Sequence, residues 1–171
     1  DADRVFLLLK GHMRRMREEL GMMPDQEVAI EHIAVSADFQ EELARIWQQY
    51  LGVGEALAAD KVEEAQVLLP KLASAVAAVD DKALKGRAKQ VWTSERSNLE
   101  KLIDGLKKSP DMKSIREGFY PVSQEMGVLA KTFGFGKAGP IYELHCPMAL
   151  QGRGATWYQN NDDTRNPYFG A

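Results

Sequence analysis

Residues 99–119, LEKLIDGLKKSPDMKSIREGF, decide the fold of this chain. Apolar residues recur at three- and four-residue steps on both sides of Pro110, which is the spacing of two amphipathic helices. Lys107 and Lys108 complement the C-terminal dipole of the first helix, and Asp111 can cap the second. A connection this short makes consecutive helices pack side by side and run antiparallel.

Two more helical patterns precede this stretch, so that four follow one another between residues 37 and 133. Asp38 can cap the first, and the second follows from Lys61. Asp80 and Asp81 are expected to open the third. The side chains expected to face the core include Leu43, Ile46, Trp47, Tyr50, Leu51, Leu57, Leu69, Leu72, Trp92, Leu99, Ile103, Phe119, Val122, Met126 and Phe133.

Two prolines fall inside these patterns. Pro70 lies in the second and Pro121 in the fourth, and we expect each to kink its helix or divide it. Gly134, Gly136 and Gly139 then end the fourth helix.

The sequence therefore predicts an all-α fold, an antiparallel four-helix bundle with up-down-up-down topology, an extra N-terminal helix and an irregular C-terminal tail. Residues 1–36 are expected to form the N-terminal helix and its connector, and residues 37–171 the bundle with its tail. The helical pattern covers residues 3–20. Residues 22–35 could be a short strand or an extended connector.

The 171-residue chain has the composition of one soluble globular domain, with 44% hydrophobic and 27% charged residues. A formal net charge of -3 gives no broad positive field, so nucleic acid is a poor partner. The apolar run at residues 5–9 is too short for a membrane span or a signal-peptide core. Because the chain begins with Asp1, we expect a processed or excised piece of a longer protein.

The run His145-Cys146-Pro147-Met148 contains the single cysteine of the chain. An imidazole, a thiol and a thioether within four residues offer soft ligands, which suit monovalent copper better than magnesium or calcium. Pro147 disfavours helical geometry at Cys146, so this segment is expected to be extended or turned. The tail must fold back onto the bundle. Four aromatic residues carry enough apolar area to anchor it: Trp157, Tyr158, Tyr168 and Phe169.

The sequence HCPMALQGRGATWYQNNDDTRNPYFG resembles the closing motif of a helical domain of periplasmic adaptor subunits, or membrane-fusion proteins, of heavy-metal efflux pumps of the RND type. The likeness extends from about Val35 to the end and is nearly residue by residue over 139–170. It implies a periplasmic location, copper or silver as the metal, and the other subunits of a tripartite pump as partners.

Members of that family usually continue past NPYFG into a short segment with a methionine and a second cysteine. This sequence stops at Ala171, so we expect a site that needs the second cysteine to be incomplete here.

Cys146 and Met148 are the first candidates for soft-metal ligands, with His145 next. Neighbouring residues such as His145 and Cys146 often point apart, so both need not bind one ion. A weaker candidate pair is His12 and Met16, four residues apart on one helical face. The alternative for these residues is structural, because a lone cysteine and stripe methionines commonly fill a core.

The leading hypothesis is a non-catalytic accessory domain of a heavy-metal efflux adaptor that holds Cu(I) or Ag(I) or helps to dock the pump. The main alternative is a stand-alone periplasmic metal chaperone or sensor, and the sequence preceding Asp1 would distinguish the two. A third hypothesis is a thiol enzyme centred on Cys146. The chain contains no haem-attachment, zinc-protease, di-iron or phosphate-loop motif, so the sequence favours a protein that is not an enzyme.

Overall fold

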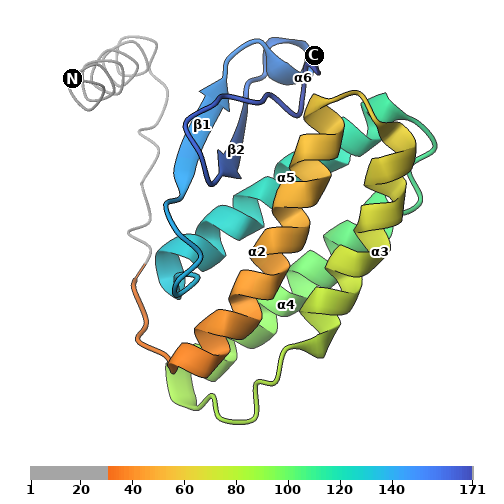
Figure 1. Cartoon of the computed structure of the whole chain (residues 1–171). Coiled ribbons are helices and arrows are strands. Elements are labelled where there is room, and N and C mark those ends of the chain that lie inside the picture. The colour runs from red at the N-terminus through yellow and green to blue at the C-terminus, as the bar shows by residue number, and fades with distance from the viewer. Residues whose placement is uncertain (1–30, 171) are drawn as a thin grey trace, which may run out of the picture.

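The computed structural model describes residues 31–170, and its main body is four long helices packed side by side (Figure 1). They are α2 (Ala37–Ala58), α3 (Val62–Ala78), α4 (Gly86–Leu106) and α5 (Met112–Thr132). Consecutive helices pack on each other and α5 returns to α2, which closes the bundle. The predicted antiparallel four-helix bundle is confirmed. None of the helices within residues 31–170 is both long and apolar enough to span a membrane.

Side-chain caps begin two of the four helices. The Asp111 carboxylate accepts a hydrogen bond from the Ser114 N–H at 2.8 Å, as the sequence predicted for α5. At α2 the cap is Ser36, whose hydroxyl accepts from the Phe39 N–H, and the predicted cap Asp38 lies in the first turn instead.

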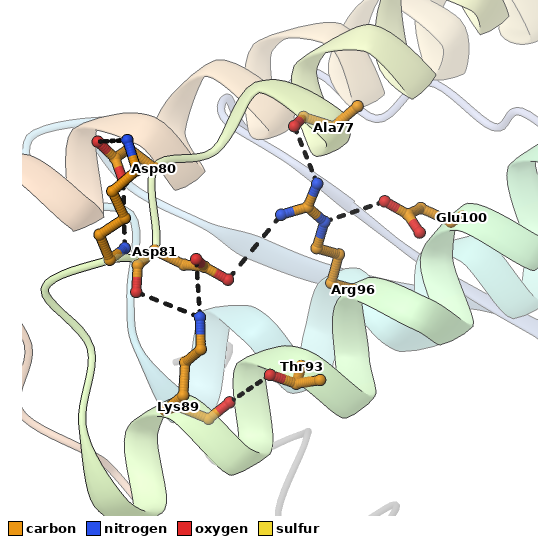
Figure 2. Close-up of polar contacts among 8 residues, drawn as sticks. Ala77, Asp80, Asp81, Lys89, Thr93, Arg96 and Glu100 are labelled. Atoms are coloured by element: carbon orange, nitrogen blue, oxygen red, sulfur yellow. Dashed lines mark hydrogen bonds and ion pairs between the residues drawn. The ribbon is translucent and has the colours of Figure 1, made fainter.

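The start predicted for the third helix at Asp80 and Asp81 is wrong, because α4 begins at Gly86. The Asp81 carboxylate lies 2.7 Å from Lys89 Nζ and 3.9 Å from Arg96 Nη1, so it forms ion pairs and does not cap a helix (Figure 2). Lys85 precedes α4 with no side-chain cap hydrogen bond.

Of the two outcomes expected at the prolines, a kink or a division, the division does not occur, since Pro70 and Pro121 lie inside the continuous helices α3 and α5. Each proline removes one backbone hydrogen bond. Leu72, which follows Pro70, and Val122, which follows Pro121, are each 0% exposed, so the buried stripe continues past both prolines. Packing of that stripe offsets the missing bond.

The core lies along the seam of α2 and α5 and is rich in aromatic rings. Tyr50 of α2 stacks on Phe119 of α5 with ring centroids 5.0 Å apart, and Trp47 stacks on Phe135 at 5.2 Å. Phe135 follows the end of α5, so the chain leaves the helix while still contributing to the core. Most of the side chains that the apolar stripes placed in the core are buried. Six others from the predicted stripes are half-buried against it: Val62, Leu68, Leu84, Val91, Leu102 and Met112.

The tail folds back onto the bundle as predicted, and it adds two strands that were not predicted (Figure 1). β1 (Tyr142–Cys146) and β2 (Ala155–Gln159) form an antiparallel pair, and a loop containing the short α6 (Ala149–Gly152) joins them. β2 packs against α5, where the Tyr158 ring crosses Gly127.

The aromatic anchors of the tail are only partly those expected. Trp157 is 4% exposed, as predicted. Tyr158 and Tyr168 are also buried, as predicted, whereas Phe169 is 53% exposed and its prediction as an anchor is wrong. The reason is a turn at Asn166, whose side-chain oxygen accepts from the Tyr168 N–H and whose carbonyl accepts from the Phe169 N–H.

Candidate functional site

The residues of the tail motif lie where the hairpin turns. Cys146 is the last residue of β1 and pairs with Ala155 of β2. Its thiol is free and half-buried against the edge of the core. Protein therefore covers Cys146 only in part.

His145 lies one position earlier in β1 and pairs with Thr156. The imidazole is exposed, and its Nδ1 lies 3.1 Å from Thr156 Oγ1. A Cβ atom at Gly154 would lie 3.0 Å from this ring, so the glycine leaves the space that the imidazole needs. Successive side chains of a strand point to opposite faces. The structure therefore does not bring the His145 and Cys146 side chains together.

Met148 follows in the loop and is 70% exposed. The next residue, Ala149, is fully buried, and Leu150 packs against the core from a half-buried position. Pro147 and these two inward residues leave the Met148 thioether directed to solvent at the tip of the hairpin.

The backbone of this loop is left-handed at two residues that are not glycine. Leu150 has φ 51° and Gln151 has φ 63°, and each such residue costs on the order of 1–2 kcal/mol. The loop is nonetheless held from within, because the Gly154 N–H donates to the Ala149 carbonyl and the Arg153 guanidinium to the Leu150 carbonyl. Its conformation is thus specified by several bonds and packed side chains.

The donor chemistry of the hairpin is soft. Among residues 31–170, no group of three or more His, Cys, Asp or Glu side chains is placed to hold a metal ion. That part of the chain therefore contains no preformed set of such ligands for zinc or harder ions. The Cys146 thiol and the Met148 thioether are soft donors of the type that selects monovalent copper over harder ions.

A buried set of hydroxyl groups seats the hairpin on the bundle. The Tyr50 and Ser123 hydroxyls lie 2.9 Å apart, and Tyr50 also accepts a hydrogen bond from the Tyr158 N–H at 3.1 Å. The Tyr168 hydroxyl donates to the Thr156 carbonyl at 3.0 Å. Burial is the main cause that raises the pKa of Tyr50, so its hydroxyl stays protonated near neutral pH.

Arg116 of α5 forms the second attachment of the tail. Its guanidinium donates to the Pro167 carbonyl, the Leu57 carbonyl and the Asp60 carboxylate, each at 2.8 Å. Sequence reasoning missed both attachments. Two features of the sequence could have indicated these attachments: Ser123 lies within an apolar stripe, and Arg116 directly follows the buried Ile115.

A separate polar cluster lies at the α3–α4 corner (Figure 2). Arg96 reaches Glu100 at 3.0 Å and the Ala77 carbonyl at 2.9 Å, and its other side faces Asp81. Lys89, the nearest ion partner of Asp81, holds the pKa of that carboxyl below its usual value. These charges are paired with one another, so we assign the cluster a structural role, which is to stabilise the connection between α3 and α4.

The weaker ligand pair, His12 and Met16, lies outside the described residues and stays a prediction.

Comparison with protein families matches residues 46–138 to a family model described as "Protein of unknown function (DUF3347)". The match covers most of the bundle and ends before β1, so it does not include the hairpin motif. Searches among curated proteins and among solved structures find no match.

Proposed function

The chain belongs to the family described as "Protein of unknown function (DUF3347)", and we propose that its bundle presents the C-terminal hairpin as a soft-metal site that takes Cu(I) or Ag(I) without catalysis. One observation carries this proposal. A free, half-buried thiol at Cys146 ends β1, and an exposed thioether at Met148 follows in a loop of specified conformation.

The bundle supplies support and the hairpin supplies the donors. Cys146 in its thiolate form is the principal ligand, and Met148 adds a neutral sulfur. His145 is the third candidate, and it would have to approach from the other face of the strand. Two donors leave the coordination open, so the ion would be held for exchange and not locked in a closed structural site.

We further propose that this metal-binding module is an accessory domain of a periplasmic heavy-metal efflux adaptor. The support is the resemblance of the tail motif, in residues 145–170, to the closing motif of such adaptors. Its partners would then be the other subunits of the pump. Growth on silver or copper salts, compared between cells with the wild-type adaptor and cells with Cys146→Ser, tests this part of the proposal.

Metal binding itself is tested by competition titration of the reduced chain with Ag(I) or Cu(I). We expect Cys146→Ser to lose most of the affinity and Met148→Leu to weaken it by about tenfold, because each removes a soft donor. Met112→Leu is the matched control, since that methionine lies half-buried at the start of α5. His145→Gln should change the affinity little.

Two further arms complete the titration. Thiolate binding releases a proton, so affinity should rise with pH through the titration of the thiol. A variant with His12→Ala and Met16→Ala separates any N-terminal site. The hairpin site would be refuted if Cys146→Ser kept the wild-type affinity, whether or not His12 and Met16 were also replaced. Cys146 would then have only a packing role.

A further inference from the structure

Two glutamates meet in the seam between α4 and α5, away from the hairpin motif. Glu95 lies on α4 and Glu125 on α5, and both are half-buried. The Glu125 Oε2 atom is buried and has no hydrogen-bond partner within the described part of the chain. Its carboxyl lies within hydrogen-bonding reach of Glu95. Two ionised carboxylates have no donor to offer each other, so this contact becomes a hydrogen bond only when one of them carries a proton.

Within residues 31–170, the charged group that acts on Glu125 is Glu95, and no cation neutralises the pair. On α4, the next residue Arg96 is engaged by Asp81, Glu100 and the Ala77 carbonyl, as Figure 2 shows. Other elements bring to α5 the hydroxyls of Tyr50, Tyr158 and Tyr168, and also two carboxylates, of which Asp60 pairs with Arg116 and Glu143 with Lys131.

Those hydroxyls have partners of their own. Tyr50 of α2 is bonded to Ser123, and Tyr158 of β2 donates to Glu143. Lys131, the basic residue in the last turn of α5, lies 3.1 Å from Glu143. Glu95 is therefore the charged group that Glu125 faces in the seam.

The physical consequence is a proton held between two acids. Burial and the neighbouring Glu95 raise the pKa of Glu125 from its ordinary 4.5 to about 8. Since two interacting carboxyls titrate as a pair, we assign the proton to the pair as a whole.

The same turn of α5 carries the seat of the hairpin. Each residue of a helix is rotated by about 100° from the one before, so residues two positions from Glu125 lie on the opposite side of α5. Those residues are Ser123, which bonds to Tyr50, and Gly127, which contacts the Tyr158 ring. A displacement of α5 away from α4 would therefore press on β2.

We propose that Glu95 and Glu125 form a proton-operated switch in the α4–α5 seam, which holds the two helices together while the proton is shared and strains the seat of the hairpin once it is lost. A folded state that binds a proton more tightly than the unfolded chain is stabilised at low pH. The contribution of the shared proton to the free energy of unfolding is complete below about pH 4.5 and disappears as the pH rises through about 8.

The direct test is a pH titration of the full chain, with its glutamate carboxyl groups labelled and followed by NMR. We expect the Glu125 carboxyl to titrate well above the exposed glutamates, and the Tyr158 amide to shift with the same midpoint because β2 rests on α5. Titration of Glu125 together with the exposed glutamates would refute the switch. A Tyr158 amide that does not follow the midpoint would refute the coupling to the hairpin.

The second test compares the free energy of unfolding across pH 5–9 for the wild type, Glu125→Gln and Glu117→Gln. Glu117 is an exposed glutamate on the same helix, so it controls for the loss of one negative charge. The wild type and Glu117→Gln should lose stability as the pH rises, whereas Glu125→Gln should show a flatter profile. An unchanged slope in Glu125→Gln would overturn the proposal, and if that variant does not fold, the wild-type NMR titration decides alone.

Discussion

At the scale of single residues, the close approach of the hairpin to the bundle depends on a helical glycine. Gly127 lies in the interior of α5, where glycine costs helix stability relative to alanine. A Cβ atom there would overlap the Tyr158 ring. The hydroxyl of that ring donates to Glu143 and its backbone N–H donates to Tyr50, so the ring cannot easily move aside.

We therefore expect Gly127→Ala to destabilise the domain in urea unfolding by up to about 3 kcal/mol through overpacking, which exceeds the gain of about 1 kcal/mol in helix propensity. Gly105→Ala in α4 is the matched control, because nothing lies within 4 Å of the Cβ position there. That substitution should stabilise by about 0.5–1 kcal/mol. If both variants gain stability, the hairpin does not rest on Gly127.

The candidate site could be predicted only as a set of residue types. Cys146, Met148 and His145 stand out in the sequence because of their chemistry, but that chemistry does not reveal which side chains share a face. The division comes from β1, in which His145 pairs with Thr156 and Cys146 with Ala155. A strand this short, followed by a loop with left-handed Leu150, carries no pattern strong enough to identify it from the sequence.

At the scale of elements, the apolar stripes predicted the four helices correctly, because the three- and four-residue repeat of apolar residues extends along the whole length of each helix. The helix ends were harder to predict, since an aspartate can cap a helix or form an ion pair equally well. Asp111 caps α5, whereas Asp81 binds Lys89 and leaves α4 to start at Gly86. Tertiary packing also decided the course of α3 and α5 past their prolines.

The uncapped start of α4 leads to a prediction. Lys85 has the extended backbone of a cap residue but makes no cap hydrogen bond, and its positive charge opposes the helix dipole. Lys85→Ser should stabilise the domain by about 1 kcal/mol, and Ser36→Ala, which removes the cap of α2, should cost about the same. Thermal unfolding measures both, and equal melting temperatures for Lys85→Ser and the wild type would contradict this account of the α4 start.

At the scale of the whole molecule, the tail is part of the folded domain and contributes to its stability. Trp157 is 4% exposed and packs edge-on against Tyr168, with ring centroids 6.0 Å apart. Phe169 carries a ring of similar character but is 53% exposed.

These two aromatic residues give a direct comparison. Trp157→Ala should destabilise the entire domain by about 3–5 kcal/mol, because it empties a buried position. Phe169→Ala should change the stability by less than about 0.5 kcal/mol. Calorimetry of the two variants measures both effects, and a Trp157→Ala variant that unfolds at the wild-type temperature would show that the bundle does not depend on its tail.

Arg116 has a consequence for the lifetime of the folded domain. Its side chain joins α5 to positions 51, 56 and 59 residues away in the sequence. We expect these contacts to form late in folding, because the distant segments must first be brought together. Interactions made after the rate-limiting barrier slow unfolding and leave the folding rate nearly unchanged. We therefore expect loss of the Arg116 side chain to shorten the time for which the native tail stays attached, with little change in how quickly the domain forms.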